Sequence, residues 1–313
     1  MLMTKPKGKI MIGIDFSSFA INTITGNLEE KDLDGKADAL PLIRHVILTS
    51  LLSIKAKYKA KFGNEIVFAV DNKTKPYWRK SVNPYYKGTR KEAREKSKYD
   101  WTYIFDCMST VKAELIENFP YKVIEVEGAE ADDVIAVLLR YVQENRKVRE
   151  GLIEAPEPFL IVSADGDYVQ LHKFDGVEQH SPKKGSLITV KSIKEVNESL
   201  LTKIIKGDAG DGICNILSEP NCLVDKIRQK AVSTEKFLNP LLENSDHSWL
   251  TKEQQERMRI NRILIDFDYI PQDIREGIVE AYNSYEVKGS KTKVFNYLIK
   301  NRLKVLFTRV DEF

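Results

Sequence analysis

Acidic residues recur in this sequence at the points where apolar segments end. Asp15, Asp71 and Asp165 each follow a short apolar run. Six further acids lie at the start of a helical pattern, in a short D-G-D segment and in a glycine-rich turn: Glu130, Asp132, Asp133, Asp167, Asp208 and Asp211. Each group alone has an ordinary explanation, because acids at a helix start oppose the helix dipole favourably and aspartates are common in turns. If the nine carboxylates converge, they repel one another or take up protons unless cations are bound between them.

The ligand types in this acidic set indicate which cation it would bind. The set offers only oxygen atoms, with no histidine or cysteine at matching positions, and this favours Mg²⁺ or Mn²⁺ over zinc. The calcium-loop pattern D-x-[DN]-x-[DN]-G does not occur. Two magnesium ions about 4 Å apart would polarise a phosphodiester, generate hydroxide from bound water and neutralise the leaving oxygen. The acidic set therefore predicts a nuclease that uses two Mg²⁺ ions, for which Mn²⁺ can substitute.

Other functions are compatible with parts of this pattern. An apolar strand followed by D-x-D-x-V is also found in haloacid-dehalogenase-type phosphatases, where Asp165 would be the nucleophile and Asp167 the acid. Only 43 residues separate Asp165 from Asp208, too few for the several strand–helix repeats of about 30 residues that such a fold needs there. A second alternative is a module that grips branched DNA without cutting it, which a missing metal ligand would reveal. A third is an α/β protein whose acidic edge is merely solvated.

A basic segment lies at residues 73–98, and we call it the arch. It contains ten lysines and arginines against Glu92 and Glu95, with aromatic residues between them, namely Tyr77, Trp78, Tyr85 and Tyr86. A charge run alone is usually a solvated surface. Aromatic rings that alternate with cations can stack on bases while the cations neutralise phosphates, so the arch predicts nucleic-acid binding.

The segments around the acidic residues predict an α/β fold. Apolar runs at 10–14, 66–70, 121–126 and from 159 predict strands, and helical patterns occupy 40–62, the segment after the N-cap Asp100 to about 118, and 130–145. Their alternation predicts a mostly parallel central sheet flanked by helices, with the functional site at the carboxyl ends of the strands. We expect a surface loop at 146–158, which is polar and contains two prolines.

Composition sets the size and class of the protein. Its 313 residues allow a nuclease domain at 1–190, which includes the arch, and a smaller, mainly helical DNA-binding domain at 191–313. No apolar run is long enough to span a membrane, and the run at 10–14 is too short for a signal peptide. Cys107, Cys214 and Cys222 fit neither a disulfide framework nor a zinc knuckle. We therefore expect a soluble cytoplasmic protein with free thiols and no membrane contact.

Six motifs in this chain resemble those of the 5′ nuclease or flap endonuclease family, in order and in spacing. They are GIDFSS at Asp15, FAVDN at Asp71, YYKGTR in the arch, GAEADD from Gly128 to Asp133, VSADGDYVQLH at Asp165 and KGDAGDG from Lys206. The resemblance extends over residues 10–313. It implies a PIN-like nuclease fold with a helix-hairpin-helix-like element in the C-terminal domain. The implied activity is 5′ to 3′ exonuclease and flap endonuclease cleavage of RNA·DNA and DNA·DNA duplexes, including RNase H removal of RNA primers from lagging-strand fragments during phage replication.

The same resemblance implies a role for each matching residue. A first metal ion would be held by Asp15, Asp71, Asp132 and Asp165, and a second would lie near Glu130, Asp167, Asp208 and Asp211, with Asp133 as a further member. In the arch, Lys87 and Arg90 would contact the scissile phosphate and act in catalysis, and Tyr86 would stack on a base. Arg79 and Lys206 would be further nucleic-acid contacts.

The implied partners are duplexes with 5′ ends or flaps. A single-stranded-DNA-binding protein would contact the C-terminal domain, a sliding clamp would bind near the N-terminus, and the nuclease would act as a monomer. One segment departs from the family, because Asp211 is followed by GICNILSEPNC where many relatives continue as D-N-I-P-G-V with a glycine-rich hairpin. The resemblance therefore leaves open whether this chain has that glycine-rich hairpin and whether it binds a monovalent ion.

Overall fold

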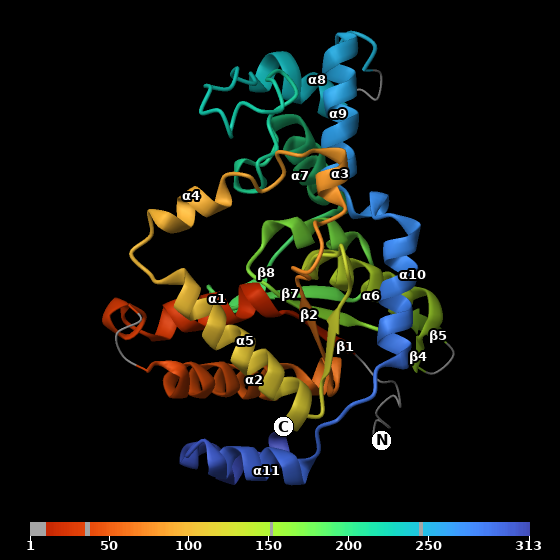
Figure 1. Cartoon of the computed structure of the whole chain (residues 1–313). Helices are drawn as coiled ribbons and strands as arrows, with labels where there is room; N and C mark the ends of the chain where they lie inside the picture. The colour runs from red at the N-terminus through yellow and green to blue at the C-terminus, as the bar shows by residue number, and fades with distance from the viewer. Residues whose placement is uncertain (1–10, 35–37, 151–152, 244–246) are drawn as a thin grey trace.

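A computed structural model describes residues 11–34, 38–150, 153–243 and 247–313 of the chain. Its centre is a six-stranded sheet with the order β3-β2-β1-β6-β7-β8 (Figure 1). The strands are β1 (Met11–Asp15), β2 (Glu65–Val70), β3 (Lys122–Glu125), β6 (Phe159–Val162), β7 (Val177–Ser181) and β8 (Ser186–Ile188). Each neighbouring pair is parallel except β7 and β8, which confirms the predicted mostly parallel sheet.

The strand register brings the strand-end acids to one edge of the sheet. β1 lies between β2 and β6, with Asp15 opposite Ala69 and Ile14 opposite Val162. Asp71 and Asp165 follow β2 and β6 within three residues of their ends. The acids of three adjacent strands therefore leave the sheet side by side, as parallel pairing requires.

Helices cover both faces of the sheet (Figure 1). One face carries α1 (Phe16–Asn27), α2 (Leu40–Phe62) and α5 (Trp101–Asn118), and the other carries α6 (Ala131–Asn145) and α10 (Gln272–Ser284). The predicted helices at 40–62, after Asp100 and at 130–145 are confirmed, and the Asp100 carboxylate accepts the Tyr103 backbone N–H as an N-cap. In the part of the chain that the structure describes, no helix is long and apolar enough to cross a membrane.

The predicted surface loop at 146–158 is wrong. β4 (Lys147–Glu150) and β5 (Ile153–Pro156) form a two-stranded antiparallel ladder there, while residues 151–152 lie outside the described part. Backbone hydrogen bonds of a ladder can hold a polar segment extended, so its composition resembles that of a loop. β7 and β8 were likewise not expected from the sequence.

A helical lobe lies beyond the carboxyl edge of the sheet (Figure 1). It contains α3 (Arg79–Val82), α7 (Ile193–Lys206), α8 (Asn239–Glu243) and α9 (Lys252–Ile265), packed around an apolar cluster with Ile204, Ile213 and Leu264. The shorter helical turns of the molecule are Glu30–Asp32, Gly166–Lys173, Ala209–Asp211, Thr234–Leu238, Phe267–Tyr269 and Lys304–Glu312.

The chain returns from this lobe to the sheet. Phe267 and Ile278 of the α10 region join the core on the α6 face, and Leu298 of α11 (Lys291–Lys300) and Leu306 join the core on the α2 face. Residues from Phe267 onward therefore pack on the nuclease core, although the predicted boundary near residue 190 placed them in the helical domain.

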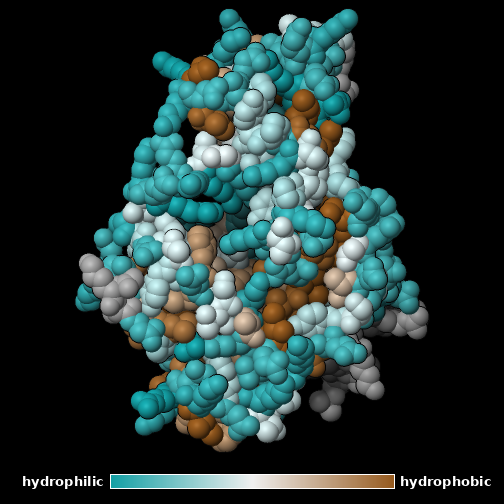
Figure 2. Space-filling model, viewed as in Figure 1, coloured by the Kyte–Doolittle hydropathy of each residue, from teal (hydrophilic) through white to brown (hydrophobic). Residues whose placement is uncertain are grey.

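The arch connects the two parts of the molecule. It leaves the sheet after β2, passes through α3 beside the helical lobe, continues through α4 (Arg90–Glu95) and descends to α5 (Figure 1). The space-filling view shows the surface hollowed beneath α4 (Figure 2). The arch therefore frames an opening beside the carboxyl edge of the sheet.

Candidate active site

The strand-end aspartates are fixed by hydrogen bonds that cross between elements. Asp15 accepts hydrogen bonds from the Ser18 backbone N–H at 2.9 Å, the Ser163 hydroxyl at 3.1 Å and the Tyr168 hydroxyl at 3.2 Å. Asp71 accepts the Ser17 hydroxyl and the Ala131 backbone N–H, each at 3.0 Å. Asp71 thereby joins the end of β2 to the start of α6, which brings the acids of α6 to the sheet edge.

The pKa values of these aspartates show how closely they approach one another. Burial, followed by the neighbouring Asp71 and Asp165 carboxylates, raises the pKa of Asp15 from 3.8 to about 7. Burial also raises the pKa of Asp165, although the Lys203 ammonium opposes that shift. The structure therefore brings Asp15, Asp71 and Asp165 together, and a bound divalent cation would relieve the repulsion between their carboxylates.

Replacement of Asp15 by asparagine is expected to stabilise the metal-free protein at pH 8. A carboxyl with a raised pKa in the folded state stabilises the fold fully below pH 3.8, and this contribution is lost as the pH rises through about 7. Asparagine cannot ionise and can still accept the Ser18 N–H, so the variant should gain about 2–4 kcal/mol at pH 8. Urea unfolding of both proteins in chelator, at pH 5 and pH 8, measures the difference. An advantage that is equal at both pH values, or absent at pH 8, contradicts the assigned cause.

The acids at the start of α6 form a second compact group. Ligand oxygens of Glu130, Asp132 and Asp133 lie within 4.8 Å of one another. Asp132 is 19% exposed, whereas the other two are buried. The Asp133 oxygens already accept hydrogen bonds from the Arg79 guanidinium, the Trp78 indole and the Glu130 backbone N–H. Asp132 is therefore the member of this group whose carboxylate an ion can reach, whereas the oxygens of Asp133 are already occupied by hydrogen bonds within the protein.

Arg79 is not on a nucleic-acid-binding surface, so the expected role of this residue is wrong. Its side chain is 2% exposed and donates hydrogen bonds to Glu130 at 2.8 Å, to Asp133 at 2.8 and 3.0 Å, and to the Leu264 carbonyl at 2.8 Å. The guanidinium offers five N–H donors in a planar fork, which suits two buried carboxylates and a helix-end carbonyl. Arg79 therefore joins the base of the arch, the start of α6 and the end of α9.

Replacement of Arg79 by methionine is expected to lower the free energy of unfolding by about 3–5 kcal/mol, because Asp133 would be left buried without a cation and Glu130 would keep only Lys87. Urea or thermal unfolding of the metal-free protein measures this loss. The matched control is Lys80→Met, which removes an exposed charge from the next residue and should change stability little. Equal effects of the two substitutions would contradict the structural role of Arg79.

Tyr86 also differs from its expected role. The residue is 1% exposed, and its ring packs in the apolar cluster of the helical lobe. Its hydroxyl donates to Glu130 at 2.9 Å and lies 3.0 Å from an Asp211 oxygen. The prediction that Tyr86 stacks on a base is wrong for this structure, because no face of the ring is open.

Two cations of the arch contact Glu130 and Asp211. Lys87 has a left-handed backbone with φ of 56° and forms an ion pair with Glu130, and its Nζ lies 3.9 Å from Asp211. Arg90 Nη2 lies 2.6 Å from Asp211 Oδ1, and the Arg90 side chain is 42% exposed. Burial would raise the pKa of Asp211, but Lys87 and Arg90 outweigh it and hold that pKa below its usual range. The arch therefore delivers positive charge to the acidic set.

Lys203 is a site residue that the sequence analysis missed. It lies on α7 and forms ion pairs with Asp167 and with Asp208, the latter at 2.7 Å. Lys206, three residues later, is exposed, and its predicted nucleic-acid contact stays a prediction. The sequence offers no signal that distinguishes these two lysines, because their order in the helix alone does not tell which one faces the acids.

The donor atoms at the sheet edge fit a divalent metal ion. Asp167, Asp208 and Asp211 pair with lysine or arginine, whereas no ion pair with a basic side chain joins Asp15, Asp71 or Asp165 among the described residues. The trio of Asp15, Asp71 and Asp165 offers only carboxylate oxygens, which suit Mg²⁺ or Mn²⁺. The uncompensated negative charge on the trio is the observation that favours a bound cation.

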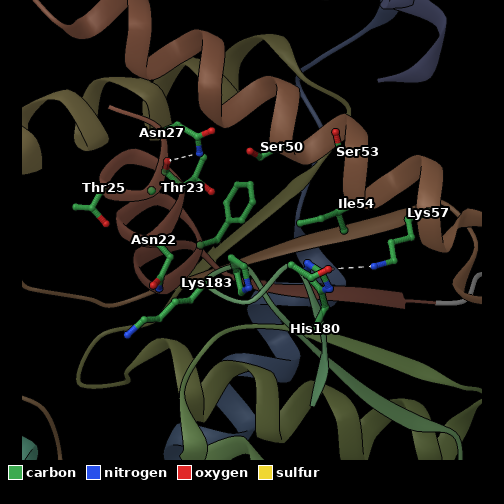
Figure 3. A pocket seen from close by; sticks show the side chains of 14 residues that line it. Asn22, Thr23, Thr25, Asn27, Ser50, Ser53, Ile54, Lys57, His180 and Lys183 are labelled. Carbon is green, nitrogen blue, oxygen red and sulfur yellow. Dashed lines mark hydrogen bonds between the residues drawn. The ribbon is translucent and has the colours of Figure 1, made fainter. Parts of the chain in front are cut away.

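The pocket drawn in Figure 3 lies elsewhere, between α1, α2 and the turn that joins β7 to β8. It has a volume of about 500 Å³ and is lined by Asn22, Ser50, Lys57, Lys183 and their neighbours, with no carboxylate among its lining residues. Burial and the nearby Lys57 lower the pKa of His180 to about 4, so its imidazole is neutral at pH 7. This pocket therefore has no part in the acidic set.

Comparison with protein families gives two matches that together extend from residue 42 to residue 313. Residues 42–199 match the model for the 5′-3′ exonuclease, N-terminal resolvase-like domain, and residues 195–313 match the model for T4 RNase H, C terminal. The Ribonuclease H of Enterobacteria phage T4 is 33% identical over 305 residues, which cover 96% of this chain and 94% of that protein.

Solved structures show the same fold. The flap endonuclease of bacteriophage T5, in a pseudo-enzyme-product complex with DNA and metal ions, is 18% identical with a TM-score of 0.57, over 88% of this chain and 99% of that one. The T5 5′-exonuclease with bound zinc ions gives a TM-score of 0.56 at 18% identity, over 88% and 98% of the two chains. These matches confirm the predicted PIN-like nuclease fold, and the alternative fold of a haloacid-dehalogenase-type phosphatase is excluded.

Proposed function

The chain belongs to the 5′-3′ exonuclease family that includes the Ribonuclease H of Enterobacteria phage T4, and we propose that it is a Mg²⁺-dependent 5′ to 3′ exonuclease and flap endonuclease. As a member of this family the chain is a nuclease, which hydrolyses phosphodiester bonds. Its proposed substrates are RNA·DNA and DNA·DNA duplexes with 5′ ends or flaps, and its proposed task is the removal of RNA primers from lagging-strand fragments in phage replication.

The observation that supports metal dependence is the group of strand-end aspartates without a basic partner. We assign a first Mg²⁺ to Asp15, Asp71, Asp132 and Asp165, and a second to the neighbourhood of Glu130, Asp167, Asp208 and Asp211. When bound, the two ions supply a polarised phosphodiester, a hydroxide and a neutralised leaving oxygen, and Mn²⁺ can serve in the same way. The hydrogen bonds from Ser17, Ser163 and Tyr168 hold Asp15 and Asp71 in place for this task.

The cations near the acidic set have a separate task in this proposal. Lys87 and Arg90 lie at the inner side of the arch and can turn from their carboxylates to the scissile phosphate, whose charge they would neutralise. Lys203 keeps Asp167 and Asp208 close together. These three residues bind and orient charged groups, and none of them needs to transfer a proton.

The turn after α7 is the proposed grip on the duplex backbone. Asp208 and Ile213 exchange two backbone hydrogen bonds of 2.8 Å, and the Asp208 carboxylate accepts the Gly210 N–H. Gly207 has φ of 72°, and a Cβ there would lie 2.3 Å from the Ile213 carbonyl oxygen, so only glycine allows this turn. Phosphate contacts from such a turn and from the exposed Lys206 would position a duplex without reading its sequence.

The family also suggests the setting in which the nuclease works. We infer that the protein acts as a monomer in the cytoplasm of a bacterial host. A single-stranded-DNA-binding protein at the C-terminal domain and a sliding clamp near the N-terminus are the proposed partners.

One assay tests the proposed activity. The purified protein is incubated with 5′-labelled RNA·DNA and 5′-flap substrates in Mg²⁺, in Mn²⁺ and in chelator. Short 5′ products in Mg²⁺ and none in chelator are expected. Tight duplex binding with no product in either metal would instead identify a binding module.

A further inference from the structure

A small cavity lies beside Asp71, on the side of α5. It has a volume of about 250 Å³, and its apolar wall includes Val70, Phe105 and Met108. Its polar lining residues include Ser17, Asp71 and Lys73. An apolar cavity of about 150 Å³ holds benzene, so this cavity has room for one nucleobase.

The cavity adjoins the carboxylates that would hold the first metal ion. Asp71 lines it, and the Ser17 hydroxyl in its wall donates to Asp71 at 3.0 Å. A group inside the cavity is therefore a direct neighbour of the site of cleavage. Apart from Asp71, no proposed metal ligand and no residue of the proposed duplex grip is among the residues that line the cavity.

Phe105 lines the cavity with an aromatic ring that lies close to two cations. It is half-buried on α5, and Lys73 Nζ lies 4.6 Å from the centre of its ring. The Arg94 guanidinium lies 5.0 Å from the same ring and comes from α4 of the arch. An aromatic ring between exposed cations is the combination that binds single-stranded nucleic acid, with the base on the ring and the phosphate near the cations.

The cavity is also on the appropriate side of the acidic set. The duplex grip after α7 lies in the helical lobe (Figure 1), whereas the cavity is lined by residues of β2, of the start of the arch and of α5. A strand that leaves the duplex and crosses the metal ligands would next meet Phe105. In the proposed flap substrate, the part of the cleaved strand that lies beyond the metal ligands from the duplex is the unpaired 5′ segment.

We propose that this cavity is a nucleotide subsite, in which the base of the unpaired nucleotide on the 5′ side of the cleaved bond stacks on Phe105 while Lys73 and Arg94 hold its phosphate. The inference rests on the proposed nuclease function, because it places one nucleotide of the substrate relative to the cleaved bond. The subsite accepts any base, since stacking does not require a particular hydrogen-bond pattern.

The test removes the base and the ring separately. In the parent protein, a flap with an abasic residue on the 5′ side of the cleaved bond should be cut about tenfold more slowly in single turnover than an intact flap, because base-on-aromatic stacking is lost. Phe105→Leu should lose about tenfold on the intact flap and nothing more on the abasic one. The control Thr102→Ala alters an exposed residue of α5 that does not line the cavity, and it should behave as the parent does.

A second measurement needs neither metal nor cleavage. A flap with 2-aminopurine at the same position is mixed in chelator with the parent, with Phe105→Leu or with Thr102→Ala, and stacking on Phe105 should quench its fluorescence in the first and third mixtures only. Equal quenching by all three proteins, or equal rate losses for the abasic flap in all three, would overturn the subsite. A parent that cuts no flap in Mg²⁺ yet quenches the fluorophore would instead overturn the proposed nuclease function and leave the subsite supported.

Discussion

Replacement of Asp132 by asparagine is expected to lower cleavage on the order of a thousandfold and to leave duplex binding intact. Asp132 is the partly exposed member of the acids at the start of α6, and one of its oxygens accepts the Asp133 backbone N–H at 2.7 Å. Asparagine keeps the shape and can accept the same hydrogen bond, but it brings no negative charge to a metal ion. The fold and the phosphate contacts of the arch should therefore survive while the proposed first metal ion loses a ligand.

Two measurements separate these effects. Single-turnover cleavage of a 5′-labelled flap in Mg²⁺ reports the chemistry, and duplex binding in chelator reports the contacts that do not need metal. Asp273→Asn is the matched control, because it makes the same chemical change at an exposed position on α10. A variant at Asp132 that cuts as fast as this control would remove Asp132 from the metal site and weaken the whole assignment.

The sequence was sufficient to predict where the acidic residues meet. Asp15 is the last residue of a buried strand, Asp71 and Asp165 follow two others, and parallel strands present their carboxyl ends at one edge. This inference needs only the order of the elements and the direction of the strands. It does not depend on the rotamer of any side chain.

The partners of the buried acids could not be predicted in the same way. Arg79 and Tyr86 are part of a basic, aromatic segment, and their composition indicates a nucleic-acid surface. Both are buried because Glu130, Asp133 and Asp211 need donors once α6 and the helical lobe enclose them. Tertiary packing decides which donor side chain enters a buried acidic cluster, and the local composition of the sequence does not reveal that packing.

Short strands were the other feature that the sequence patterns did not predict. β4, β5, β7 and β8 are each three to five residues long, and polar residues predominate in several of them. Their backbone hydrogen bonds are made with other segments, so local composition gives little sign of them. The return of α10 and α11 to the nuclease core is likewise a matter of packing, since their apolar faces would fit either domain.

Replacement of both Lys87 and Arg90 by alanine is expected to lower turnover on the order of a hundredfold and to flatten the salt dependence of duplex binding. Two phosphate contacts release about two counterions, so the slope of log K against log salt should become shallower by about 1.8. Lys87 is 14% exposed and Arg90 42% exposed, which leaves both within reach of a bound strand. Binding measured between 50 and 200 mM salt in chelator gives the slope, and single-turnover cleavage in Mg²⁺ gives the rate.

The control for this pair removes the same charge from the far end of the molecule. Lys300 of α11 and the nearby Lys304 are both exposed, and their double alanine variant should retain the parent's rate and slope. In the structure, Lys87 and Arg90 contact Glu130 and Asp211, so the rate and the slope together distinguish an effect on these carboxylates from an effect on the phosphates of the substrate. A slower rate with an unchanged slope would mean that the two cations act only by neutralising these carboxylates. A shallower slope shows that they leave the carboxylates for the backbone of the substrate, as the proposed function of the arch requires.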